Sequence, residues 1–161
     1  MDDLKKEVRD FWNEASCGEH LLLDASDKPG YLAQMEKRYS LEPFIENFAL
    51  FDDARGRDVL EIGVGLGADH QRYAEGGARL TGIDLTDRAV EHTRRRLELF
   101  DLKSDLRVGD AEALPFADES FDWVYSWGVL HHSPDTVRAI DEVWRVLRWR
   151  GTARIMIYHK H

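Results

Sequence analysis

The feature that most constrains this chain is the alternation of short apolar runs with helical stretches that begins at Asp58. The runs expected to form strands cover residues 58–62, 79–84, 105–108, 121–127 and 153–159. Apolar residues at helical spacing separate them, at about 68–75, 87–100 and 135–147. Strands that alternate with helices are typical of a parallel sheet with helices on both faces. The sequence therefore predicts an α/β fold, doubly wound around a mostly parallel sheet.

The first third of the chain has a different pattern. Residues 2–51 contain helical segments interrupted at "SCGEH" and "SDKPG", and no strand is expected before Val59. We expect a helical segment over residues 1–55, followed by a core over residues 56–161. A chain of 161 residues is long enough for one sizeable core.

The charge of the chain excludes one class of partner. Its formal net charge is −9, whereas nucleic-acid binding requires clustered positive charge. The densest basic run, "TRRR" at 93–96, lies in a helical pattern whose apolar residues share one face. We expect these arginines to face solvent, and we expect no nucleic-acid partner.

Two observations concern the compartment. No apolar stretch reaches the roughly 18 residues of a membrane span, and no apolar signal segment stands at the N-terminus. The single cysteine, Cys17, cannot form an internal disulfide, which agrees with a reducing compartment. We therefore expect a soluble, cytoplasmic protein without a membrane partner.

A glycine-rich turn follows the first expected strand. The segment "VLEIGVGLGADH" places Gly63, Gly65 and Gly67 directly after a buried-looking run. Glycine costs conformational entropy on folding, so its repeated use suggests that a ligand comes close to the backbone. Such a turn, at the carboxyl edge of a parallel sheet, offers free N–H groups to a ligand. The spacing also fits the loose glycine pattern of dinucleotide-binding folds, with Asp84 about 20 residues beyond Gly63.

Three carboxylates follow neighbouring expected strands and favour a different ligand. Glu61 lies just before the first glycine of the turn, where it would repel a pyrophosphate but suit a cation. Asp84 and Asp110 follow the second and third expected strands. An acidic edge of this kind fits a ligand with an ammonium group, a ribose diol and an adenine amine. S-adenosylmethionine carries all three groups, and a nicotinamide-dependent oxidoreductase is the rival interpretation.

Four motifs in order make the chain recognisable. "VLEIGVGLG", "GIDLT", "GDAEALPF" and "FDWVYSWGVLHHSPD" resemble the successive motifs of the class I, Rossmann-like S-adenosylmethionine-dependent methyltransferases of small molecules (EC 2.1.1). The resemblance covers about Asp58 to Tyr158. It implies a Rossmann-like sheet of about five strands in the order 3-2-1-4-5, with the N-terminal helices as a lid across the cofactor.

The resemblance also implies which residues bind the cofactor, S-adenosylmethionine, whose product is S-adenosylhomocysteine. The full set comprises Glu61, Gly63, Val64, Gly65, Gly67, Asp84, Leu85, Asp110, Ala111, Ser126 and Trp127. Gly63 and Gly65 would let the backbone approach the methionine part, and Glu61 would shape that pocket. Ser126 and Trp127 would line the pocket beside the methionine, chiefly through their backbone carbonyls.

The same resemblance places the adenosine part at the ends of the second and third strands. Asp84 would bind the ribose hydroxyls, and Leu85 would pack against the adenine. Asp110 would accept a hydrogen bond from the adenine amine, and the Ala111 N–H would reach a ring nitrogen.

Candidate catalytic residues are fewer. His131 and His132 follow the fourth strand, where His132 could act as a general base near pH 7 or could pack and orient the loop. Tyr31, beside the Pro-Gly break, is the second candidate, as a lid residue over the sulfonium, whereas Trp12 is expected to pack in the core. No metal is expected, because adjacent histidines usually point apart and no clear third ligand accompanies them.

The sequence and its resemblance predict transfer of a methyl group from the sulfonium to a small-molecule nucleophile by in-line displacement. The thioether leaves as a neutral group, so the main tasks of the protein are alignment and exclusion of water. The alternative is a module or fragment that binds S-adenosylmethionine without independent turnover and needs self-association or a partner.

Two departures from the family pattern bear on this choice. The segment "RWRGT" at 148–152 stands where the family has a Pro-Gly-Gly-like turn, which puts the geometry of that turn in question. The chain also ends at His161, just past the fifth expected strand, so we expect an exposed edge carrying Ile155, Met156 and Ile157. An exposed edge is a template for strand pairing and predicts a homodimer through this strand, or a partner that covers it.

Overall fold

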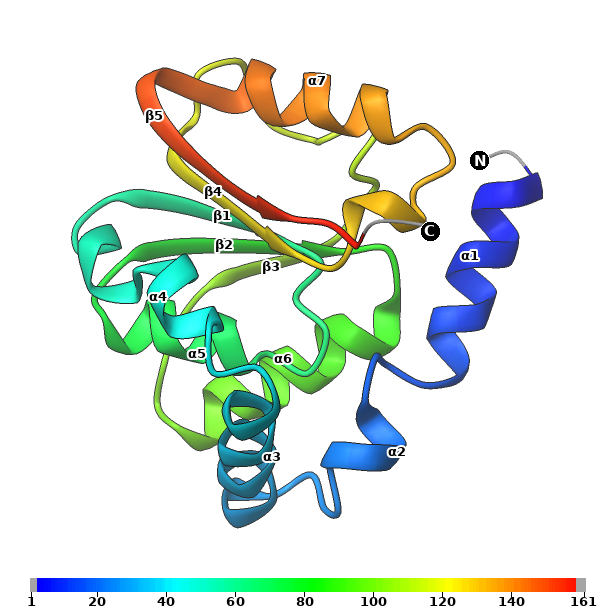
Figure 1. Cartoon of the computed structure of the whole chain (residues 1–161), viewed down its shortest axis with the longest axis vertical. Helices are drawn as coiled ribbons and strands as arrows, with labels where there is room; N and C mark the ends of the chain where they lie inside the picture. Colours follow the sequence, from blue (N-terminus) through cyan, green and yellow to red (C-terminus); the bar gives the residue numbers. More distant parts are fainter. Residues whose placement is uncertain (1–2, 159–161) are drawn as a thin grey trace.

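The computed structural model describes residues 3–158 and contains one five-stranded parallel sheet (Figure 1). Its strands are β1 (Asp58–Ile62), β2 (Arg79–Asp84), β3 (Asp105–Val108), β4 (Phe121–Trp127) and β5 (Leu147–Met156). They are ordered β3-β2-β1-β4-β5, and every neighbouring pair is parallel. The predicted α/β class and strand order are confirmed.

Helices cover both faces of this sheet. The connecting helices are α5 (Ala68–Glu75), α6 (Asp87–Leu99) and α7 (Thr136–Val146), with a short helix η2 (Leu130–His132) after β4. In Figure 1, α5 and α6 lie on one face and α7 lies on the other. The starts of α6 and α7 are fixed by side-chain caps, because Thr86 accepts from the Ala89 N–H and Asp135 from the Arg138 N–H.

Each face of the sheet has its own apolar cluster, because side chains alternate along each strand. Leu60 and Ile62 of β1 pack with α7, whereas Val59 packs toward α5. Glu61 points to the same face as Val59 and is 3% exposed. The Glu61 carboxyl group is therefore buried between the sheet and α5, next to the glycine turn that follows β1.

The N-terminal helices are α1 (Asp3–Glu14), α2 (Glu19–Leu22), α3 (Lys28–Leu41), α4 (Ile45–Ala49) and η1 (Phe51–Ala54). The "SDKPG" break is the start of α3 and not a loop, since Pro29 occupies its first turn and Asp27 caps the Gly30 N–H. In Figure 1, α1 stands beside the carboxyl ends of the strands. Within residues 3–158, no helix has the length and apolar character that a membrane span requires.

The expectation that the arginines of 93–96 face solvent is wrong for Arg96. Its side chain is fully buried and donates to the side-chain oxygens of Gln71 and Gln34 at 2.7 and 2.6 Å. It also donates to the carbonyl oxygens of Leu66 and Tyr31 at 2.9 and 2.7 Å. Burial lowers the pKa of Arg96 to about 10. The arginine joins α6 to α3, α5 and the glycine turn, and it therefore has a structural role.

The fifth strand differs from its predicted span of 153–159. It begins at Leu147, and residue 159 lies outside the described part of the chain. The register with β4 shifts between Phe121 and Trp123, where Arg150 takes a positive φ of 63°. The "RWRGT" segment is therefore a bulged part of β5 rather than a separate turn.

Candidate functional site

A cavity opens at the carboxyl edge of the sheet, between the glycine turn and the N-terminal helices. Most of the predicted cofactor residues line it: Glu61, Gly63, Val64, Gly65, Gly67, Asp84, Leu85, Asp110, Ala111 and Trp127. His132 lines the same cavity from η2. Ten of the eleven predicted cofactor residues and one of the two candidate catalytic residues therefore face a common space.

Glycine stands at the three positions of the turn for different structural reasons. All have positive φ, at 83° for Gly63, 52° for Gly65 and 77° for Gly67. A β-carbon on Gly63 would collide with Val129, and one on Gly67 would lie 2.8 Å from the Thr93 hydroxyl oxygen. A β-carbon on Gly65 would meet no described atom within 4 Å. Two glycines thus allow close packing inside the protein, and Gly65 leaves open space at the cavity.

Asp84 is tied to the same turn. Its Oδ2 accepts the Gly65 N–H at 3.2 Å, and its Oδ1 accepts the Thr86 N–H at 3.1 Å and the Thr86 hydroxyl at 2.9 Å. Burial raises the pKa of Asp84 despite these hydrogen bonds. The carboxylate is held in one orientation at the end of β2, beside the open backbone of Gly65.

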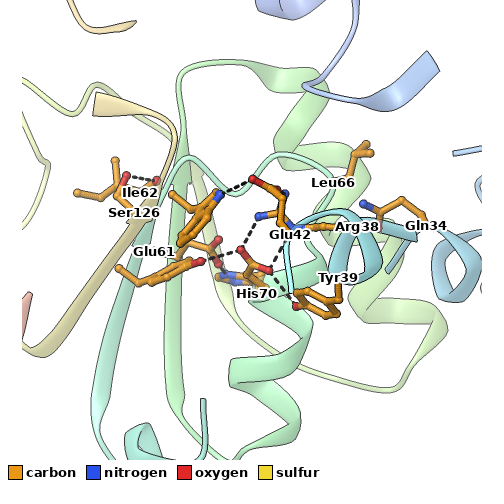
Figure 2. Close-up of polar contacts among 12 residues, drawn as sticks. Gln34, Arg38, Tyr39, Glu42, Glu61, Ile62, Leu66, His70 and Ser126 are labelled. Atoms are coloured by element: carbon orange, nitrogen blue, oxygen red, sulfur yellow. Dashed lines mark hydrogen bonds and ion pairs between the residues drawn. The ribbon is translucent and has the colours of Figure 1, made fainter. Parts of the chain in front are cut away.

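Glu61 belongs to a buried polar chain. Its Oε2 lies 2.7 Å from His70 Nδ1 (Figure 2), and His70 Nε2 lies 2.8 Å from the Ser104 hydroxyl. Burial, with the negative charge of Asp69, raises the pKa of Glu61 well above its usual range, and burial lowers that of His70 to about 3. Burial of both groups favours the uncharged form of the pair at neutral pH.

A second network joins α3 to the start of α5. Asp69 is buried and accepts from Arg38 at 2.8 Å, from Tyr39 at 2.9 Å and from Tyr125 at 2.8 Å (Figure 2). Burial alone would raise the pKa of Asp69, but the charge and hydrogen bonds of Arg38 lower it. Arg38 also lies 3.3 Å from Glu42, and both residues line the cavity. This network brings a cation and a carboxylate from α3 to the glycine turn.

Helix α1 closes another side of the cavity. Lys5 lies 2.7 Å from Asp110 Oδ2 and 2.6 Å from Glu112 Oε2. Trp12 packs edge-on against His132, with ring centroids 5.3 Å apart. The N-terminal segment therefore contacts both the third-strand carboxylate and the loop after β4.

Two predicted residues do not line the cavity. The Ser126 side chain is fully buried and donates to the Ile62 carbonyl at 3.0 Å, since it points to the α7 face of β4. Tyr31 is also fully buried, with its hydroxyl 3.0 Å from His92 Nδ1. The predicted role of Tyr31 as a lid residue over a sulfonium is therefore corrected, because its ring packs between α3 and α6.

His131 and His132 lie side by side in the loop after β4. Their rings are tilted by 42° with centroids 4.0 Å apart, and of the two only His132 lines the cavity. Over residues 3–158, no group of three or more histidine, cysteine, aspartate or glutamate side chains is placed to hold a metal ion.

Several cavity residues were missed by the sequence analysis. They come from the N-terminal helical region and from the segment after β5: Lys5, Ser16, Arg38, Glu42 and Tyr158. Their contacts join positions far apart in the chain, as in Glu42 with Trp127 and with Tyr158. No motif marks them, and only the tertiary fold brings them to the site.

Comparison with known proteins agrees with this geometry. A family model described as a methyltransferase domain matches residues 60–155. The chain is 34% identical over 107 residues to phosphoethanolamine N-methyltransferase 2 of Caenorhabditis elegans, covering 65% of this chain and 24% of that protein. It is 41% identical over 101 residues to phthiotriol/phenolphthiotriol dimycocerosates methyltransferase of Mycobacterium tuberculosis, covering 62% and 37%.

The fold has solved relatives as well. The YcgJ protein of Bacillus subtilis superposes with a TM-score of 0.65 and 28% identity, covering 70% of this chain and 49% of that one. The matched region spans between about a quarter and a half of the length of the curated relatives. On its sheet order, its glycine turn and the matched family model, the chain belongs to the methyltransferase domain family of class I, Rossmann-like S-adenosylmethionine-dependent methyltransferases.

Proposed function

We propose that this chain binds S-adenosylmethionine in the cavity at the carboxyl edge and supports methyl transfer to a small-molecule nucleophile. The observation that carries this proposal is the charge of the cavity. Five acidic side chains line it, whereas Lys5 and Arg38 are its only lysine or arginine among residues 3–158 and both are ion-paired. A pyrophosphate would meet repulsion there, and a ligand that carries sulfonium and ammonium charges would not.

The residues present also fit the shape and polarity of this ligand. The open face of Gly65 and the apolar side chains of Val64 and Leu85 line the cavity next to Asp84. The Ser16 hydroxyl is buried in the cavity lining and has no hydrogen-bond partner within residues 3–158. A buried hydroxyl without a partner is costly, so a polar group of a ligand would stabilise it.

Each cavity residue then has a defined task. Asp84 would bind the ribose hydroxyls, with Leu85 against the adenine, and Asp110 and the Ala111 N–H would meet the adenine edge. Glu61 would face the ammonium group, whose positive charge would favour the ionised form of this carboxyl. S-adenosylmethionine, when bound, supplies an electrophilic methyl group on a sulfonium.

The chain's own part in the reaction is alignment and exclusion of water. His132 lines the cavity and is the residue that would take a proton from an acceptor that needs a general base. Residues 1–55 would act as the lid, since α1 supplies Lys5 and Trp12 and α3 supplies Arg38. The named activities of the two relatives support methyl transfer by the fold and leave the acceptor open.

Self-association through β5 remains a prediction. Within the described residues β5 pairs only with β4, and Ile157 beside its end is 51% exposed. Sedimentation at micromolar concentration should reveal a dimer that Ile157→Lys weakens. A monomer under these conditions would contradict the prediction.

The cofactor assignment is tested by calorimetric titration with S-adenosylmethionine and, in parallel, with NAD. We expect saturable binding of S-adenosylmethionine alone, weakened about tenfold or more in Asp84→Asn because a charged hydrogen-bond acceptor is lost. Asp87→Asn, an exposed carboxylate in the first turn of α6, is the matched control. Binding of NAD alone would overturn the assignment. Binding without methyl transfer to any acceptor would favour the alternative of a module without turnover.

A further inference from the structure

Glu42 lies at one end of the cavity in a setting that no family motif marks. It caps the C-terminus of α3 and lines the cavity. Its Oε1 accepts from Trp127 Nε1 at 3.3 Å (Figure 2). The same oxygen accepts from the Tyr158 hydroxyl at 3.1 Å, and Oε2 lies 3.3 Å from Arg38. The carboxylate is thus held between an indole and a phenol at the end of β4.

The charge of Glu42 is only partly balanced. Arg38 makes its shorter ion pair, at 2.8 Å, with the buried Asp69, and its longer contact with Glu42. Lys5, the other basic residue of the lining, is held by Asp110 and Glu112. This end of the cavity therefore keeps negative charge, and a positively charged group would be attracted to it.

The rings beside Glu42 contact other aromatic side chains, although Tyr158 is 55% exposed. Trp127 packs against Phe44 and Phe48, with ring centroids 5.6 and 5.3 Å apart, and Tyr158 packs against His131 at 5.4 Å. Burial and the charge of Glu42 raise the pKa of Tyr158, so its hydroxyl keeps the proton that it donates. Aromatic rings attract cations through their electron-rich faces, and desolvation strengthens this attraction.

Resting on the proposed function, we propose that Glu42, Trp127 and Tyr158 form the recognition site for the methyl acceptor, and that this acceptor is an amine. Its ammonium form binds the carboxylate between the two rings, at the strand end where the fourth motif lies. The nitrogen becomes a nucleophile once it has lost its proton to a base, and His132 lines the same cavity. An acceptor with a carboxylate or phosphate at this position meets the charge of Glu42 with no free cation in the described lining. The inference concerns recognition, so binding alone can test it.

The test uses three probes of one shape, 2-phenylethylamine, 2-phenylethanol and 3-phenylpropanoate. Each is titrated by calorimetry into the chain saturated with S-adenosylhomocysteine, for the wild type, Glu42→Gln and Glu46→Gln. Glu46 is the matched control, because it is an exposed carboxylate in the next helix, α4, and does not line the cavity. Thermal melting of each variant confirms that it is folded before titration.

We expect the amine to bind at least about tenfold more tightly than the carboxylate, with the alcohol between them. Glu42→Gln should bring the three probes within about twofold of one another, and Glu46→Gln should keep the wild-type order. Equal binding of all probes, tighter binding of the carboxylate, or no binding of any probe would overturn the proposal. Failure of S-adenosylhomocysteine to bind would instead refute the proposed function on which it rests.

Discussion

The carboxyl edge of the sheet and the N-terminal helices both line the cavity, but they are organised differently. At the edge, Gly65 and Asp84 belong to neighbouring strand ends, and their positions follow from the parallel pairing of β1 with β2. The N-terminal helices are joined to the rest of the fold by long-range side-chain contacts, such as Lys5 with Asp110 and Arg96 with Tyr31. A ligand site on the sheet is therefore built into the fold, whereas its cover depends on a few side chains.

The largest expected effect comes from the residue that joins the two regions. Arg96→Met would leave the oxygens of Gln34, Gln71 and two carbonyls without their buried donor. We expect the free energy of unfolding to fall by about 3 kcal/mol or more, as measured by urea denaturation. Arg95→Met, at an exposed position on the same helix, is the control and should change it by less than about 0.5 kcal/mol. Equal losses would show that Arg96 does not join the regions.

A second prediction concerns the sheet edge alone and separates binding from stability. Gly65→Ala and Gly56→Ala place a β-carbon at a positive φ, in open space in both cases. Each should cost about 1 kcal/mol of stability through backbone strain. Only Gly65→Ala should weaken S-adenosylmethionine binding, by about tenfold, because only that β-carbon enters the cavity. Equal affinities in titration would mean that the ligand does not approach Gly65.

The helices offer a smaller effect. Lys5→Met removes the ion pairs to Asp110 and Glu112 and should free α1 from the sheet edge at a cost of about 1 kcal/mol. Hydrogen exchange of residues 3–14 should then be about fivefold faster in the free chain, with no change in β1 or β2. Lys6→Met, on the exposed face of α1, is the control. Unchanged exchange in α1 would contradict the proposal that the ion pairs of Lys5 hold this helix against the sheet edge.

The smallest expected effect is the release of a proton from Glu61 when the ligand binds. The free chain keeps the pKa of Glu61 raised by burial and by Asp69, so the carboxyl is protonated above its usual range. An arriving ammonium group lowers that pKa, and up to about one proton is released on binding. Affinity should therefore increase as the pH rises toward the raised pKa. Titration at one pH in buffers of different ionisation enthalpy measures this release, which Glu61→Gln should abolish.

The sequence predicted the sheet well because its signals are local. The spans of β1 to β4 follow apolar runs bounded by turn residues, and the parallel order follows from their alternation with helices. The fifth strand was predicted to begin several residues after its actual start, because a bulge near Arg150 interrupts its apolar pattern. The burial of Arg96 and Tyr31 could not be predicted, since their partners lie more than one element away.

The same division holds within the site. Asp84 and Gly65 could be predicted from one motif and the next strand end. Glu42 could not, because its partners Trp127 and Tyr158 come from β4 and from the segment after β5. The proposed cofactor residues stand in motifs, whereas the proposed acceptor residues are brought together only by the tertiary structure.

Hydrogen exchange of the full chain, with and without S-adenosylhomocysteine, tests the central claim most directly. The account predicts slower exchange in the glycine turn at 63–67, at the ends of β2 and β3, and in α1 and α3 as the cover closes. Protection confined to the sheet edge would support the ligand site there but contradict the proposal that the N-terminal helices cover it. Ligand binding that leaves residues 63–67 and 84–85 without any protection would contradict the account itself.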